Sequence, residues 1–198
     1  MSDESLTDRL PLVPGAVAGA GAYLLGYLLT YLWQGSAVEE RLQGVNVIAD
    51  LLGGEPIAVW QGVGWLFYNA HFVRTRAAGV LGGTRSWNAI AAADDGTLAL
   101  LYLVPVILLV AVGALLARIG TAETAGEGAV AGTAAVVGYL PPAVAGAVVF
   151  TYDGSVAPDL VTAVLLAGIA YPVVLGAIGG AVGSVAGGVV GGMAGGEE

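Results

Sequence analysis

Four long stretches without a single Asp, Glu, Lys or Arg constrain this chain more than any other feature of its sequence. They cover residues 13–33, 98–117, 129–150 and 160–190. Because a helix rises 1.5 Å per residue, about 20 apolar residues cross the roughly 30 Å hydrocarbon core of a bilayer. Each stretch is near that length or longer. The sequence therefore predicts an all-α integral membrane protein, a helical bundle in which residues 1–198 form one membrane domain.

The composition excludes several classes of chemistry. Only 11% of the residues are charged, against about 25% in soluble domains. The chain has no Cys and no Lys, which excludes disulfides, thiolate metal sites, a P-loop lysine and Schiff-base catalysis. All six basic residues are Arg and no basic face is apparent, so we expect no nucleic-acid partner.

The charge balance points to a salt-rich environment. Fifteen acidic residues against six Arg give a formal net charge of −9. Concentrated salt shortens the reach of like-charge repulsion to about 3 Å at 1 M, which lets an acidic surface persist. An acidic surface without lysine thus predicts a halophilic source.

A fifth, shorter span is expected at residues 57–73. These seventeen residues give a helix of roughly 25 Å, so a tilted span and an interfacial or re-entrant helix both fit, and the span is the preferred interpretation. Gly82-Gly83 predicts a hairpin, and Asp94–Thr97 a helix start. The predicted spans are 13–33, 57–73, 98–117, 129–150 and 160–182, with an amphipathic interfacial segment at 34–56 and a glycine-rich C-terminal segment at 183–198.

Polar side chains gather on one arc of the helix expected at 57–73. At 100° per residue, the opposite side forms an apolar stripe suited to lipid. Polar amides on a membrane helix normally turn inward and hydrogen-bond another helix. The alternative is a lined cavity bounded by proline kinks at residues 139–142 and 171–172, in the stretches 129–150 and 160–190. The residues of this candidate polar face or cavity are Gln61, Tyr68, Asn69, His71, Tyr139 and Tyr171.

Glycines recur at four-residue spacing in the first and last stretches. This small-xxx-small pattern lets helix backbones approach closely, so we expect packing within or between chains. The candidate packing residues are Gly15, Gly19, Gly176, Gly180, Gly183, Gly187 and Gly191.

Catalytic and metal-binding patterns are missing from the sequence. No long stretch holds a charged residue that could relay protons or bind ions. The single histidine, His71, suits an interfacial or packing role, with a proton or ligand contact as the alternative. No Ser lies in a Gly-x-Ser-x-Gly elbow, and a zinc site would need more donors. We expect no enzyme, no catalytic residues, no metal and no cofactor.

Two segments carry a resemblance to a known family. The aromatic segment Trp60–Val73 and the opening Gly21–Tyr31 resemble a haloarchaeal family of small multi-pass membrane proteins of unknown function. The resemblance implies an uncharacterised archaeal cell-membrane protein and supplies no catalytic residues.

The functional expectation is a non-catalytic structural or interaction protein of the cell membrane. Its partners would be the lipid bilayer and a second copy of the chain or another membrane protein. The alternative is a small transporter or channel for an uncharged solute. With five spans, four Arg lie on the side of the N-terminus and two on the other side, which places the N-terminus in the cytoplasm.

Overall fold

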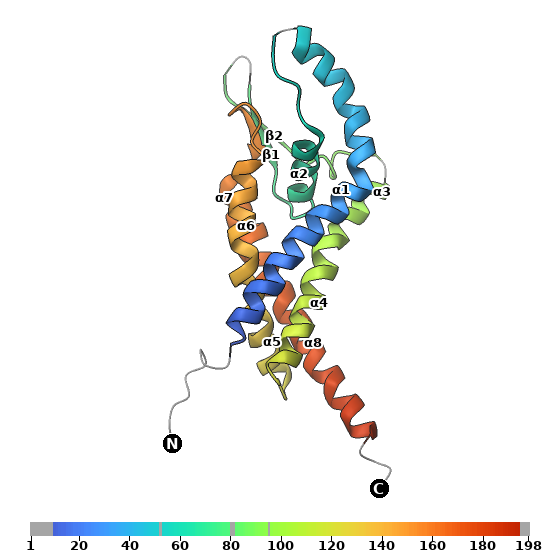
Figure 1. Ribbon diagram of the computed structural model, residues 1–198, viewed down its shortest axis with the longest axis vertical. Coiled ribbons are helices and arrows are strands. Elements are labelled where there is room, and N and C mark those ends of the chain that lie inside the picture. The colour runs from blue at the N-terminus through green and yellow to red at the C-terminus, as the bar shows by residue number, and fades with distance from the viewer. Residues whose placement is uncertain (1–9, 52, 80–81, 95, 195–198) are drawn as a thin grey trace. The chain divides into compact units, whose positions relative to one another are not determined.

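The protein is mostly helical, with one small sheet (Figure 1). The computed structural model describes residues 10–194 except residues 52, 80, 81 and 95, and gives only the helical backbone for residues 187–194. The elements are α1 (Leu12–Leu51), α2 (Val59–Asn69), β1 (Thr75–Ala78), β2 (Thr84–Trp87), α3 (Gly96–Ala99), the 3₁₀ turn η2 (Leu100–Tyr102), α4 (Leu103–Ile119), α5 (Ala125–Thr133), α6 (Ala135–Val149), β3 (Val156–Pro158), α7 (Leu160–Thr162), the π-helix η3 (Ala163–Ala170) and α8 (Tyr171–Ala194).

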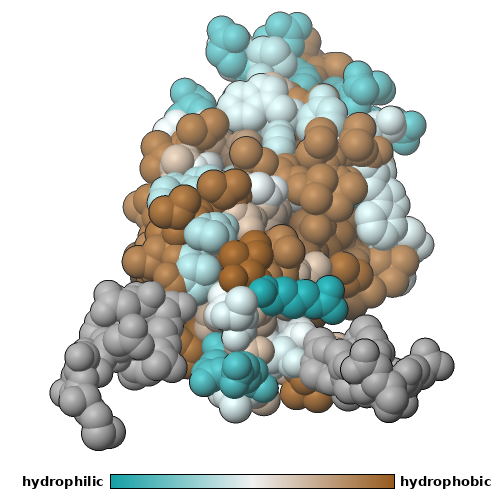
Figure 2. All heavy atoms as spheres, turned by 60° about the horizontal axis from the view of Figure 1, so that its bottom comes forward, coloured by the Kyte–Doolittle hydropathy of each residue, from teal (hydrophilic) through white to brown (hydrophobic). Residues whose placement is uncertain are grey.

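Four helical stretches in the described part of the chain are long and apolar enough to cross a membrane. They are Leu12–Leu51, Gly96–Ile119, Ala125–Val149 and Leu160–Ala186. Many of their large apolar side chains are exposed, for example Leu32 at 73% and Val161 at 64%. Figure 2 shows hydrophobic residues over much of the face that it draws. Such exposure is typical of a surface that meets lipid tails.

The first helix is longer than the sequence predicts. Instead of ending near Trp33 before a separate interfacial segment, α1 continues to Leu51 and has 40 residues in all. It ends in a Schellman motif, in which Gly53 has a φ of +76° and the Gly54 N–H donates to the Ala49 carbonyl at 2.8 Å. Only glycine adopts that φ without strain, so the helix ends where the sequence supplies Gly53-Gly54.

The expected second span is replaced by a short helix. Residues 57–73 contain α2, which has 11 residues and a length of only about 16 Å by the helical rise. Its expected lipid-facing stripe is buried in protein, since Val63, Phe67 and Ala70 are at most 1% exposed. We therefore correct the five-span prediction to four long helices plus a short buried one.

Three antiparallel strands form a sheet in the order β2-β1-β3. The hairpin predicted at Gly82-Gly83 is confirmed, because β1 pairs with β2 from Thr75↔Trp87 to Ala78↔Thr84. Both glycines have a positive φ, as tight hairpin turns require. Strand β3 pairs with the other edge of β1. The predicted helix start near Asp94–Thr97 is also confirmed, since α3 begins at Gly96.

Two of the long helical stretches are irregular. Ala125–Val149 divides at Ala134 into α5 and α6, and α6 continues through Pro141 and Pro142. In the last stretch the π-helix η3 ends immediately before Tyr171-Pro172. Proline has no backbone N–H to donate to the carbonyl four residues earlier. In the π-helix before Pro172 each N–H bonds to the carbonyl five residues earlier, so the hydrogen-bond pattern changes there.

The chain forms two compact units. One contains the described residues up to Tyr23, Val106–Pro142 and the residues from Gly168 onward, and the other contains Leu24–Pro105 and Ala143–Ala167. In the first unit, small residues let α5 and α8 meet backbone to backbone. A Cβ added to Gly180 would lie 1.9 Å from the Gly128 carbonyl oxygen. The second unit has an aliphatic cluster of Leu66, Ala70, Ile90, Leu98 and Leu101, and it contains α2.

Candidate functional site around helix α2

Three side chains of α2 donate hydrogen bonds to carbonyls of α6 and of the residues just after it. Gln61 Nε2 donates to the Thr151 carbonyl at 3.0 Å and Trp65 Nε1 to the Phe150 carbonyl at 2.7 Å. The Tyr68 hydroxyl donates to the carbonyl of Ala143. Positions 61, 65 and 68 follow the four-then-three spacing of one helix face. Two of the accepting carbonyls, those of Phe150 and Thr151, lie just past the end of α6, where the helix itself supplies no N–H partner. The side chains of α2 supply these partners instead.

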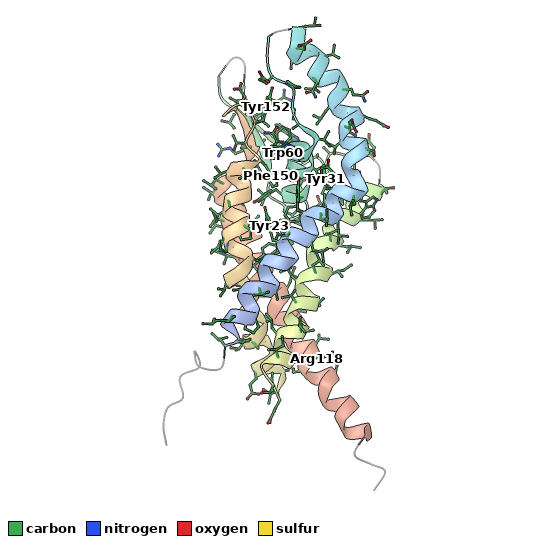
Figure 3. All side chains as sticks on the ribbon, viewed as in Figure 1. Tyr23, Tyr31, Trp60, Arg118, Phe150 and Tyr152 are labelled. Atoms are coloured by element: carbon green, nitrogen blue, oxygen red, sulfur yellow. The ribbon has the colours of Figure 1, made fainter. Side chains whose placement is uncertain are left out.

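Two glycines on opposite sides of α2 allow neighbouring segments to approach it closely. A Cβ on Gly64 would lie 2.4 Å from Cγ of Phe150, and one on Gly62 would lie 2.8 Å from Cγ1 of Val38 in α1. Figure 3 labels Trp60 of α2 and Phe150, whose ring centroids are 5.9 Å apart. The Phe150 ring also stacks on Tyr27 of α1 at 5.2 Å. Aromatic rings from three segments, Tyr27, Trp60 and Phe150, therefore pack together on the Gly64 side of α2.

An asparagine pair fixes the carboxyl end of α2. Asn69 is fully buried, and its Nδ2 donates to the Val73 carbonyl at 2.8 Å and to Thr75 Oγ1 at 3.3 Å. Its Oδ1 accepts from the Ala89 N–H at 2.7 Å. In return Asn88 Nδ2 donates to the Asn69 carbonyl at 3.0 Å. The polar atoms of Asn69 thus serve the fold, as buried polar groups normally do.

His71 is buried beside the same end of α2. Its side chain is 0% exposed, and its ring makes an edge contact with Phe67 at 4.8 Å. Nδ1 lies 2.8 Å from the Phe67 carbonyl, and it must carry the proton because a carbonyl only accepts. Burial lowers the pKa of His71 to about 4, although the Phe67 carbonyl acts in the opposite direction. The imidazole is therefore neutral at neutral pH.

The segment before α2 is held by side chains that sequence reasoning missed. Asn46 of α1 accepts from the Ile57 N–H at 2.8 Å and donates to the Ile57 carbonyl at 3.1 Å. The Tyr152 hydroxyl donates to the carbonyl of Glu55. Trp65 and Asn88 were also missed as hydrogen-bonding residues. Only weak features of the sequence indicated these two residues. Trp65 is four residues after Gln61 and so lies on the same helix face, and Asn88 follows directly after β2.

The predicted polar residues divide between the two units. Gln61, Tyr68, Asn69 and His71 belong to the unit that contains α2, whereas Tyr139 and Tyr171 belong to the other. Tyr139 is 1% exposed, and its ring meets that of Tyr23 edge to face at 5.4 Å. Tyr171 interacts electrostatically with Tyr139.

The predicted packing glycines contact neighbouring helices of the same chain where their surroundings are described. A Cβ on Gly15 would lie 2.4 Å from the Ala134 carbonyl oxygen, and one on Gly183 would lie 2.7 Å from Cα of Ala114. Gly19, Gly176 and Gly180 likewise face backbone atoms of Ala135, Gly132 and Gly128. Gly187 and Gly191 fall in the part of α8 whose surroundings are outside the described residues.

Within the described residues, no group of three or more His, Asp or Glu side chains is arranged to hold a metal ion. Every buried side-chain nitrogen and oxygen in that part of the chain has a hydrogen-bond partner. The hydrogen bonds of these polar side chains hold the short helix α2 in place within its unit.

The comparison with family models gives one finding. A family described as being of unknown function, DUF7978, matches residues 1–187. No curated protein and no solved structure matches the chain.

Proposed function

We propose that this chain, which belongs to the DUF7978 family of unknown function, is a non-catalytic structural or interaction protein of a cell membrane. One observation carries the proposal. The side chains with the best potential for chemistry, Gln61, Tyr68, Asn69 and His71, bond to carbonyls, an N–H or a hydroxyl of their own unit. A polar set committed to its own fold favours a scaffold over a reaction centre or a solute path.

The membrane part of the proposal rests on the four long apolar helices. Their exposed leucine and valine side chains would meet lipid tails, and a helix pairs most of its backbone groups internally, as a hydrocarbon environment requires. The net charge of −9 and the absence of lysine support a halophilic, archaeal-type cell membrane.

Four spans reverse the orientation expected from five. The N-terminus and the loop after α4 then share one side, which holds Arg9 and Arg118. The other side holds Arg41, Arg74, Arg76 and Arg85. Under the positive-inside rule the side with four Arg is cytoplasmic, so we place the N-terminus outside.

Cysteine labelling tests the proposal cleanly because the native chain has no thiol. Single cysteines would replace Val63 and Ala70, which are fully buried, and Thr84, which is exposed on the hairpin. We expect a water-soluble maleimide to label Thr84→Cys and to leave the other two variants unlabelled in native membranes. Labelling of Val63→Cys and Ala70→Cys as fast as Thr84→Cys would reveal a water-filled path beside α2. That result would replace the scaffold with a transporter or channel for an uncharged solute.

A further inference from the structure

Two arginines lie on the same face of the hairpin. Arg74 and Arg76 are two residues apart, so their side chains leave the extended backbone on one side. Ser86 of β2 is the register partner of Arg76 and shares this face. Arg85 is the partner of Ala77, so it lies on the opposite face.

These side chains line a cavity of about 200 Å³. Its lining residues are Phe72, Arg74, Arg76, Ser86, Asp159 and Thr162. It offers two guanidinium groups, two hydroxyls, one carboxylate and one aromatic ring. All six residues belong to the unit that contains α2.

The carboxylate in this cavity is already engaged. Asp159 Oδ2 accepts from Arg76 Nη1 at 2.7 Å, and its Oδ1 accepts from the N–H and the hydroxyl of Thr162 at 2.9 and 2.8 Å. Arg74 forms no ion pair with any described carboxylate. The cavity therefore carries a formal charge of +1 in a chain whose net charge is −9.

The cavity lies where two long apolar helices begin. Asp159 immediately precedes Leu160 and Val161, which are 48% and 64% exposed. Phe72, another residue that lines the cavity, is 56% exposed. Its ring stacks on Tyr102 of η2, with the ring centroids 4.5 Å apart and an angle of 10° between the ring planes. Phe72 has a φ of +59°, a conformation that non-glycine residues rarely adopt and that places this ring at the cavity. Cationic groups bordered by exposed apolar side chains match the boundary between headgroups and tails.

We propose that this cavity binds the phosphate group of an anionic phospholipid. The Arg74 and Arg76 guanidinium groups donate to the non-bridging phosphate oxygens, and the Ser86 hydroxyl donates to the headgroup. The lipid tails then lie along Leu160 and Val161. This inference rests on the membrane location in the proposed function, but not on the chain being non-catalytic.

Native mass spectrometry of protein extracted from vesicles tests the proposal. The vesicles contain equal amounts of phosphatidylglycerol and phosphatidylcholine, and every variant is measured at the same ionic strength because salt screens exposed charges. We expect the wild-type chain to retain phosphatidylglycerol in preference to phosphatidylcholine. In Arg74→Gln that preference should fall about fivefold, the factor that corresponds to the roughly 1 kcal/mol contributed by each basic residue at a lipid surface. Arg74→Lys should keep most of it.

Arg85→Gln is the matched control, since it removes the same charge from the opposite face of the same hairpin and should behave as wild type. Equal losses in Arg74→Gln and Arg85→Gln, or no lipid preference in the wild-type chain, would overturn the proposal. A further arm adds glycerol 3-phosphate. Displacement of the lipid by this soluble ester would show that the cavity takes phosphate from solution and would refute a lipid source. If the chain does not enter vesicles at all, the membrane location itself fails, which is a different result.

Discussion

The buried histidine makes the stability of the protein depend on pH in a defined window. The pKa of His71 is about 4 in the fold, against an ordinary value of 6.5. Below pH 6.5 the unfolded chain therefore binds a proton that the folded chain excludes, and stability falls as the pH falls. By linkage the loss is about 2 kcal/mol at pH 5 and about 3 kcal/mol once the pH is below 4. Near pH 7.5 it is close to zero by the same relation.

Thermal unfolding of purified protein in lipid nanodiscs, at about pH 7.5 and about pH 5, measures this loss as a fall in Tm on the order of 5 °C. His71→Gln keeps a side chain that hydrogen-bonds but does not titrate, so its Tm should change much less between the two pH values. The comparison uses the pH dependence of each variant and not its absolute stability, so a general weakening by the substitution does not affect it. An equal fall in both proteins would refute the argument that burial of His71 causes the dependence.

Three further substitutions test the packing and bonding described above. Gly64→Ala should destabilise the fold by about 1 to 3 kcal/mol because its Cβ would overlap the Phe150 ring, whereas Gly44→Ala, with open space around it, should leave Tm unchanged or raise it. Asn88→Ala should cost about 1 to 3 kcal/mol in thermal unfolding, since it removes partners from the Asn69 carbonyl and the Ile90 N–H; a neutral result would remove the asparagine pair from the argument. Partial burial acts to raise the pKa of Asp159, but the Thr162 and Arg76 hydrogen bonds outweigh it and the pKa lies below 3.8. Asp159→Ala should therefore lower stability by about 1 kcal/mol at neutral pH, and a pH series should show the difference from wild type shrinking as the pH falls below that value.

Long apolar runs, the hairpin and the start of α3 were predictable because each depends on local sequence. Uncharged stretches report burial or lipid directly, and Gly82-Gly83 supplies the backbone conformation that the turn needs. The length of α1 was not predicted, because the prediction ended the first span at residue 33, whereas the helix ends only at Gly53-Gly54. Aromatic residues mark an interface, but they do not stop a helix.

The short helix α2 shows why the site was only partly predictable. Helical periodicity placed Gln61 and Tyr68 on one arc, and both donate to carbonyls of α6 or of the residues just after it, but the prediction took the apolar face to be lipid-exposed. In the structure Val63 and Phe67 are buried, because α1 and the segment after α6 approach α2 through Gly62 and Gly64. Which surface covers a short apolar helix depends on tertiary contacts, and these leave no periodic signal in the helix itself.

The 40 residues of α1 make this helix longer than a bilayer is thick. At the helical rise they extend about 60 Å, twice the roughly 30 Å thickness of the hydrocarbon core. In the membrane location proposed above, a helix of this length that crosses along the bilayer normal would leave about half of its residues outside the hydrocarbon core, on the side of Gly53-Gly54 or of the N-terminus. Energy transfer between a dye attached at Gly53 and a dye in the bilayer surface would measure how far that end of α1 lies from the lipid, up to about 3 nm for a helix along the bilayer normal.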